Sequence, residues 1–156
     1  MRIGVLALQG AVSEHINMVK SLGVNAIPVK NAEQINSVDG LIMPGGESTT
    51  MGRLITKFEL ENVIKERIRE GMPVYGACAG MILLAKRIKN HDQFSLGILD
   101  ITVIRNAFGR QVDSMEVDLN VKGFESPFHA IFISCLLYTS DAADDLLCVD
   151  LGGRRI

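Results

Sequence analysis

The chain has 156 residues, 47% of them hydrophobic and 22% charged, with 16 basic against 18 acidic residues and a formal net charge of −2. This length predicts one domain, the apolar fraction is too high for a disordered chain, and the charge balance gives no electrostatic case for nucleic-acid binding. The longest uncharged apolar-rich run, residues 71–85, is shorter than the roughly 20 residues of a membrane-spanning helix, so no membrane segment is expected.

From the N-terminus, short apolar runs alternate with segments of helical periodicity. Strands are predicted at residues 2–8, 24–29, 40–43 and 73–77. Helices are predicted at 12–22, from 48 onward, over the apolar stripe 60–68 and from 81 onward, with hydroxyl N-caps offered by Ser48, Thr49 and Thr50. Strands separated by helices of this length require right-handed crossovers and give a parallel sheet covered on both faces. The predicted fold class is α/β, doubly wound and mostly parallel.

Later in the chain the period changes from helix to strand. Apolar and polar residues alternate over 115–121, which predicts a half-exposed strand, and 128–133 is predicted as one more strand. Both are expected to be antiparallel additions. The basic run 86–89 is interpreted as a solvated helix end rather than a nucleic-acid patch.

Residues 134–156 differ in composition from the rest of the chain. They hold its entire net charge and two of its three Cys, Cys135 and Cys148. The three Cys form no CxxC pair, which argues against a disulfide framework and a zinc site and makes a reducing cytoplasm the default location.

A small-residue motif around Cys78 lies between a predicted strand and a predicted helix. Gly76-Ala77-Cys78-Ala79-Gly80 has the spacing of a nucleophile elbow, with Cys where hydrolases have Ser. A tight strand-to-helix turn exposes the nucleophile above the sheet, and only small neighbours avoid clashing across it. The dipole of the following helix favours the thiolate. A buried structural Cys is the alternative interpretation of this residue.

A second candidate loop, Pro44-Gly45-Gly46-Glu47-Ser48-Thr49-Thr50, follows the third predicted strand. Consecutive glycines let backbone approach a ligand and leave N–H groups to point at an oxyanion. Loops at the carboxyl ends of parallel strands border the ligand crevice, so this loop is expected to face the Cys78 elbow. Alone, such a loop is more typical of a plain turn with a helix cap, and only its pairing with the Cys78 elbow favours the functional interpretation.

The three His residues give no clear general base. His15 lies on the first predicted helix, His91 in a polar loop and His129 near a late strand, and none has an acidic residue two positions on. Each is interpreted as a surface or partner-facing His. Gln9-Gly10 after the first strand could line the crevice or form a plain polar turn.

Four segments in order resemble the glutaminase subunit of pyridoxal 5′-phosphate synthase, a family of class I glutamine amidotransferases. They are residues 4–15, 39–51, 76–80 and 106–114. The resemblance implies a class I glutamine amidotransferase-like (flavodoxin-like) fold for residues 1–133. It also implies hydrolysis of L-glutamine to L-glutamate and ammonia, with ammonia passed to a separate synthase subunit for pyridoxal 5′-phosphate (vitamin B6) biosynthesis.

By the family pattern, Cys78 attacks the glutamine side-chain amide and forms a glutamyl thioester. The oxyanion would be held by backbone N–H groups of Ala79 and of the Gly45-Gly46 loop. The implied substrate contacts are Gly46, Glu47, Ser48, Arg105 and Ile133. No cofactor and no metal are implied. The implied partners are L-glutamine and the synthase subunit in a hetero-oligomer, with the docking contact near residues 9–15.

The chain departs from the family pattern after Ile133. The family continues there with Arg-Ala-Pro and later His-Pro-Glu, which supplies the base and its orienting carboxylate, whereas the 156 residues contain no His-Pro-Glu. Residues 134–156 are therefore expected to be a non-family tail, artefactual or disordered, after a truncated glutaminase domain at 1–133. Losing one member of a nucleophile–base system can remove a factor on the order of 10⁶ in turnover, so this chain is expected to be inactive or nearly so.

Two other functions stay open at this point. The missing His-Pro-Glu favours a non-catalytic module that only docks on the synthase. A Cys elbow is also typical of α/β stress proteins and peptidases that do not use glutamine, although the segments 44–50 and 108–114 argue against this alternative.

Overall fold

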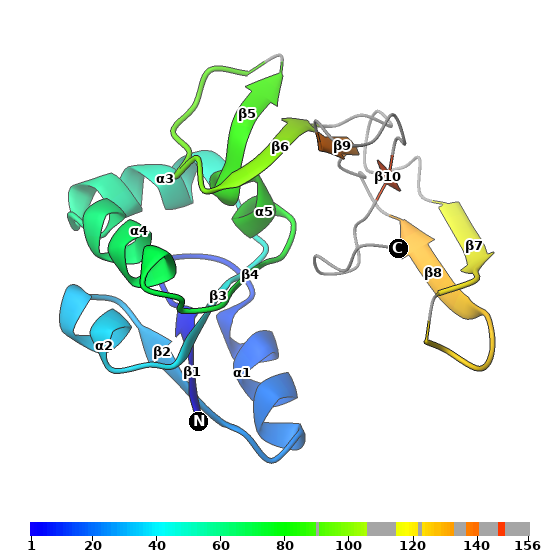
Figure 1. Ribbon diagram of the computed structural model, residues 1–156, viewed down its shortest axis with the longest axis horizontal. Helices are drawn as coiled ribbons and strands as arrows, with labels where there is room; N and C mark the ends of the chain where they lie inside the picture. The colour runs from blue at the N-terminus through cyan, green and yellow to red at the C-terminus, as the bar shows by residue number, and fades with distance from the viewer. Residues whose placement is uncertain (90, 106–114, 122, 133–136, 141–146, 149–156) are drawn as a thin grey trace.

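The computed structural model describes residues 1–89, 91–105, 115–121, 123–132, 137–140 and 147–148 (Figure 1). The described strands form two four-stranded sheets and a separate two-stranded ribbon. The first sheet carries the three loops on which the sequence places the candidate chemistry.

This first sheet has the strand order β2-β1-β3-β4, and all of its pairings are parallel. Its strands are β1 (Arg2–Leu6), β2 (Asn25–Val29), β3 (Gly40–Met43) and β4 (Val74–Gly76). The connecting helices are α1 (Val12–Ser21), α2 (Ala32–Asn36), α3 (Ser48–Lys57) and α4 (Glu61–Arg69). The predicted α/β, doubly wound arrangement of parallel strands is confirmed.

The strand order sets which face each helix covers. The chain moves from β1 to β2 in one direction and then crosses back over β1 to β3 and β4. Right-handed crossovers therefore put α1 on one face and α2 and α4 on the other, as Figure 1 shows. The direction reverses between β1 and β3, and ligand crevices in open α/β sheets lie at such a reversal.

The main hydrophobic core packs between this sheet and the helices on the α4 side. Fully buried side chains come from the strands and from α3 and α4, among them Leu6, Met43, Met51, Ile55 and Ile64. Within the described part of the chain, no helix is long and apolar enough to span a bilayer.

The short helix α5 (Ala79–Leu84) leads into a second sheet of order β10-β9-β6-β5. Its strands are β5 (Ala85–Lys89), β6 (Leu99–Ile104), β9 (Leu137–Ser140) and β10 (Leu147–Cys148). The interpretation of the basic run as a helix end is wrong, because residues 86–89 belong to β5. Parallel pairing with β6 and a 2.8 Å hydrogen bond from Arg87 Nε to Thr102 Oγ1 hold this segment extended.

An antiparallel ribbon is formed by β7 (Met115–Leu119) and β8 (Phe128–Phe132). On β7, Val117 and Leu119 are half-buried whereas Glu116 and Asp118 are exposed, so the predicted half-exposed strand is confirmed. The expected antiparallel additions are also confirmed, since β7 pairs antiparallel with β8. Strand β9, which was not predicted, pairs antiparallel with both β6 and β10. Strands β9 and β10 lie within 134–156, and the division of the chain at residue 133 stays a prediction.

Candidate active site

The loops after β1, β3 and β4 are joined at the reversal point of the sheet. The Ala11 N–H donates to the Gly45 carbonyl at 2.9 Å, which links the first loop to the second. The Ala77 N–H donates to the Met43 carbonyl at 3.0 Å, which links the third loop to the end of β3. The expectation that the Gly45-Gly46 loop faces the Cys78 elbow is confirmed, because a Cβ added to Gly45 would lie only 3.6 Å from the Cys78 Cβ.

The Cys78 elbow has the strained backbone that a nucleophile elbow requires. Cys78 is the N-cap residue of α5 with φ 46° and ψ −103°, a left-handed conformation that L residues rarely adopt, and its side chain is exposed. A Cβ on Gly76 would come within 2.8 Å of the Gly80 carbonyl carbon, and a Cβ on Gly80 within 2.1 Å of the Met43 oxygen. The surrounding backbone therefore leaves no room for side chains at the two outer positions of the motif.

The side-chain amide of Gln9 supports the Gly45-Gly46 loop through a hydrogen bond. The Glu47 N–H donates to Gln9 Oε1 at 2.8 Å. A Cβ on Gly46 would lie 2.5 Å from the same oxygen and 3.0 Å from the Gly10 Cα, so only glycine fits there without displacing the first loop. Gln9 is therefore part of the site rather than of a plain polar turn.

Glu47 caps α3, a role that the sequence pattern predicts for the hydroxyls that follow it. Its carboxylate accepts the backbone N–H groups of Thr49 at 3.1 Å and Thr50 at 2.6 Å. Hydrogen bonding from Thr50, with further bonds from Thr49, lowers the pKa of Glu47 to about 2. The prediction of a hydroxyl N-cap is wrong, because a carboxylate can accept both N–H groups of the first turn at once. Ser48 is instead buried, with 2% of its surface exposed.

A polar cluster centred on Gln93 joins the start of α3 to Arg105. Gln93 Oε1 accepts from Arg105 Nη1 at 2.5 Å, from Ser48 Oγ at 3.2 Å and from Thr49 Oγ1 at 3.4 Å. The other guanidinium nitrogen, Arg105 Nη2, lies 3.8 Å from Glu47 Oε1. These contacts bring Arg105, which directly follows β6, next to the glycine loop.

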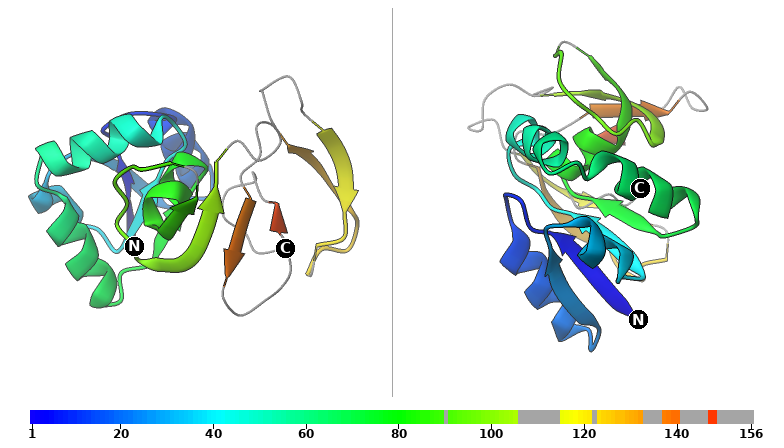
Figure 2. Two further views of the ribbon diagram at one scale, coloured as in Figure 1. Left: turned by 90° about the horizontal axis from the view of Figure 1, so that it is seen from above. Right: turned by 90° about the vertical axis from the view of Figure 1, so that its left-hand side faces the viewer.

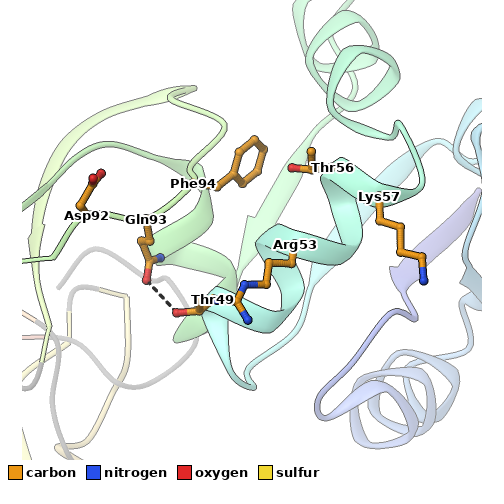
Figure 3. A pocket seen from close by; sticks show the side chains of 7 residues that line it. All are labelled: Thr49, Arg53, Thr56, Lys57, Asp92, Gln93 and Phe94. Atoms are coloured by element: carbon orange, nitrogen blue, oxygen red, sulfur yellow. Dashed lines mark hydrogen bonds between the residues drawn. The ribbon is translucent and has the colours of Figure 1, made fainter.

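A cavity of about 450 Å³ lies beside this cluster, between α3 and the segment before β6 (Figure 3). Its lining residues are Thr49, Arg53, Thr56, Lys57, Asp92, Gln93 and Phe94. Figure 3 shows the Gln93 amide directed toward Thr49 at one end of the cavity.

The predicted site residues fall into two groups. Cys78, Ala79, Gly45 and Gly46 meet at the elbow, and Glu47, Ser48 and Arg105 meet at the start of α3. The predicted contact at Ile133 lies outside the described residues. Gln93 was not predicted, since no local motif distinguishes it.

Two of the three His residues have defined surroundings. His15 packs edge-on against Tyr75 with ring centroids 6.4 Å apart, and burial lowers the pKa of His15. His129 Nδ1 lies 2.8 Å from an Asp118 oxygen and its Nε2 3.3 Å from a Glu116 oxygen, and these carboxylates raise the pKa of His129. Figures 1 and 2 show the β7–β8 ribbon, which carries His129, apart from the β1–β4 sheet.

Among the described residues, no group of three or more His, Cys, Asp or Glu side chains is arranged to hold a metal ion. The described site combines the exposed Cys78 thiol with the Gly45-Gly46 loop and with an Arg105 guanidinium held by Gln93 and Glu47.

Comparisons with known proteins agree with this geometry. The SNO glutamine amidotransferase family matches residues 5–146. The pyridoxal 5′-phosphate synthase subunit PdxT of Bacillus thuringiensis is 48% identical over 156 residues, which are 100% of this chain and 79% of that protein. The protein of the same name from Bacillus anthracis has the same identity and coverage.

One solved structure supports the same family, and a second shows the same fold. A crystal structure of a glutamine amidotransferase matches with a TM-score of 0.79 and 45% identity, over 87% of this chain and 72% of that one. PurLQS from Thermotoga maritima matches with a TM-score of 0.58 at 14% identity, over 96% of this chain and 70% of that one, which shows the fold alone. The chain belongs to the SNO glutamine amidotransferase family.

Proposed function

We propose that this protein is a glutaminase that hydrolyses L-glutamine to L-glutamate and ammonia. The observation that carries the proposal is the exposed Cys78 thiol on a left-handed elbow, with the Gly45-Gly46 loop against it. Membership of a glutamine amidotransferase family supports glutamine as the substrate.

The proposed reaction begins at the thiolate of Cys78. Its Sγ attacks the side-chain amide carbon of glutamine, and the carbonyl electron pair moves to oxygen. Backbone N–H groups of Ala79 and of the Gly45-Gly46 loop stabilise this oxyanion, a contribution of the kind that typically accounts for a factor of about 10² to 10³. The carbonyl re-forms as the C–N bond breaks, and the amide nitrogen takes a proton from water and leaves as ammonia. Water hydrolyses the glutamyl thioester and regenerates the thiol.

Arg105 is proposed to bind the α-carboxylate of the substrate. A guanidinium presents two N–H groups in the geometry of a carboxylate, and Arg105 is already directed toward the glycine loop by Gln93 and Glu47. Gly46, Glu47 and Ser48 are proposed to contact glutamine through their backbone, since the Glu47 and Ser48 side chains are engaged in capping α3 and in bonding Gln93. Ile133 is proposed as a further substrate contact, and this assignment rests on the sequence resemblance alone.

The general base is not assigned to any of the three His residues of this chain. His129 has the carboxylate partners that a base needs, but its ribbon lies apart from the β1–β4 sheet, and His15 packs against Tyr75. An elbow with an oxyanion hole and no base leaves about 10³ to 10⁴ over the uncatalysed rate. We therefore expect covalent capture of a reactive glutamine analogue to be measurable, and steady-state turnover by these 156 residues to be very low.

The proposed partner is a synthase subunit that consumes the ammonia in pyridoxal 5′-phosphate formation. The relative from Bacillus thuringiensis is named as a subunit of pyridoxal 5′-phosphate synthase, which supports a hetero-oligomer. A cytoplasmic location is proposed with it, supported by three Cys without a CxxC pair.

The test is covalent labelling of the full chain by a diazo ketone that mimics glutamine. We expect one adduct by intact mass, located at Cys78 by peptide mapping, blocked by excess glutamine and absent from Cys78→Ala. Labelling that glutamine does not block would favour the stress-protein or peptidase alternative. Ammonia release that persists in Cys78→Ala would show that the nucleophile is wrong.

A non-catalytic docking module on the synthase is the alternative function that these measurements separate from the glutaminase. Co-purification with the synthase, together with no labelling and no ammonia release, would support this function instead. The proposed boundary at residue 133 is tested separately by re-reading the coding DNA across codons 133 and 134. A frame that continues into Arg-Ala-Pro would identify residues 134–156 as an artefact.

A further inference from the structure

The segment that carries Gln93 is fixed to the scaffold by backbone contacts. The Leu96 N–H donates to the Leu83 carbonyl at 2.6 Å, and the Ile98 N–H donates to the Leu84 carbonyl at 2.9 Å. These bonds attach the segment before β6 to the end of α5. The position of Gln93 is therefore set by helix α5, which begins at the elbow.

Phe94 fixes the same segment against α3. Phe94 packs on the main core, and Gly52 of α3 leaves the space for its ring, since a Cβ on Gly52 would lie 3.1 Å from Phe94 Cδ1. Figure 3 shows Phe94 and Gln93 facing α3 from adjacent positions. With Phe94, Leu96 and Ile98 anchored directly after it, the Gln93 amide has little freedom to move away from the start of α3.

The Gln93 amide acts in this structure as an acceptor. Its oxygen accepts three donors, whereas its Nε2 is buried and has no hydrogen-bond partner among the described residues. An unpaired buried N–H₂ group destabilises a protein, so a residue needed only to fill volume would be better replaced by an apolar one. The useful part of the side chain is its oxygen.

Arg105 is held at both ends of its guanidinium. Nη1 donates to Gln93 Oε1 at 2.5 Å, and Nη2 faces Glu47, whose carboxylate is itself fixed by the first turn of α3. A guanidinium donates two parallel N–H bonds to a carboxylate only when the planes of the two groups are aligned. A freely rotating arginine side chain loses this alignment. Arg105 is largely covered, with 21% of its side chain exposed, so few waters can substitute for the Gln93 oxygen.

We propose that Gln93 is a positioning residue that orients Arg105 toward the substrate carboxylate and ties it to the glycine loop through Ser48 and Thr49. This inference rests on the proposed function, because it assigns a role to Arg105 in glutamine binding. It adds a residue from a different segment to the substrate subsite and explains why that subsite forms before substrate arrives.

The experiment measures the labelling rate of Cys78 as a function of the concentration of the diazo ketone. Gln93→Met keeps the volume and removes the acceptor. We expect its half-saturating concentration to rise roughly tenfold or more, as for loss of a hydrogen bond to a charged group, with the limiting rate unchanged. Gln93→Glu keeps an acceptor oxygen, and we expect it to return the half-saturating concentration to within about threefold of the parent value.

Two controls separate positioning from general damage. Iodoacetamide has no α-carboxylate, so its rate with Cys78 should be the same in the parent chain and in Gln93→Met. Asp92→Asn changes the preceding residue in the same cavity and should leave the half-saturating concentration unaltered.

An unchanged half-saturating concentration in Gln93→Met would overturn the inference. So would a parallel fall in the iodoacetamide rate, or a Gln93→Glu chain as weak as Gln93→Met. A parent chain that reacts with iodoacetamide but not with the diazo ketone would refute the proposed function instead. In that case, ¹⁵N spectra of the Arg105 guanidinium still test the positioning. Separate Nη signals in the parent that merge in Gln93→Met support it, and merged signals in both overturn it.

Discussion

Replacing Gly10 by Ala should disrupt the site more than the same change at Gly71, although both glycines have nearly the same positive φ angle. Gly10 has φ +100° and Gly71 has φ +103°. An alanine at either position carries the left-handed strain of about 1–2 kcal/mol. A Cβ on Gly71 meets no atom within 4 Å, whereas a Cβ on Gly10 would lie 2.0 Å from the Gly45 carbonyl oxygen.

The additional destabilisation at Gly10 can be estimated from these contacts. Forcing backbone apart in a packed region costs about 1–3 kcal/mol. Displacing Gly45 also breaks the 2.9 Å hydrogen bond from the Ala11 N–H, which contributes about 1 kcal/mol. The free energy of unfolding should therefore fall by about 2–4 kcal/mol more in Gly10→Ala than in Gly71→Ala.

Urea denaturation followed by far-ultraviolet circular dichroism measures this difference for the two variants side by side. Labelling of Cys78 by the diazo ketone gives a second readout, since only Gly10→Ala should displace the glycine loop. Equal destabilisation of the two variants, within about 0.5 kcal/mol, would show that moving the loops after β1 and β3 apart costs no measurable free energy. The interlocked geometry of the site would then be refuted.

Further outcomes follow from the charged groups. Glu47→Ala should destabilise the chain by about 1 kcal/mol at neutral pH, because α3 loses its cap. Since the pKa of Glu47 is about 2 in the folded chain and ordinarily 4.5, the difference from the parent should be complete above pH 4.5 and should vanish as the pH falls through 2. A pH-independent difference in urea titrations would contradict the capping role. In NMR titrations, His129 should have a pKa above 6.5 and His15 one below 6.5. Asp118→Asn should lower the value for His129 and leave that for His15 unchanged, and equal pKa values for the two His residues would refute their assigned surroundings.

The parallel part of the fold was predictable because its signals are local. The strand at residues 40–43 has its predicted bounds in the structure, since Gly40 begins the apolar run and Pro44 ends it. The elbow was predictable for the same reason. Its tight turn requires small residues at fixed spacing, and the clashes at Gly76 and Gly80 are the physical origin of that pattern.

Helix α2 was missed although its signal was present. Asn31 accepts the Gln34 N–H at 2.9 Å, and Gln34 returns the bond by accepting the Lys30 N–H at 2.7 Å. This exchange resembles the reciprocal bonding of a capping box, so Asn followed three residues later by Gln could have indicated the helix. The helix has only five residues, which is too short for its apolar periodicity to be read.

Other parts could not be predicted from local patterns. The strand at residues 86–89 has charges that suit a helix end, and only pairing with β6 makes it extended. Gln93 has no sequence signature, because its role depends on the docking of its segment on α5 and on an arginine twelve positions later. Such residues become visible only when contacts distant in the chain are known.

The loops of the site are joined by bonds between residues far apart in sequence, and this has a consequence for the order of folding. The bond between Gln9 and Glu47 spans 38 positions, and the central strand β1 finds its neighbour β3 only after β2 has been passed. The elbow requires β4 to be paired with β3, because the Ala77 N–H donates to the Met43 carbonyl at 3.0 Å. Before that point, Cys78 lies on unstructured backbone and has the reactivity of an ordinary thiol. Its reaction with the diazo ketone can therefore serve as a clock for completion of the sheet during refolding.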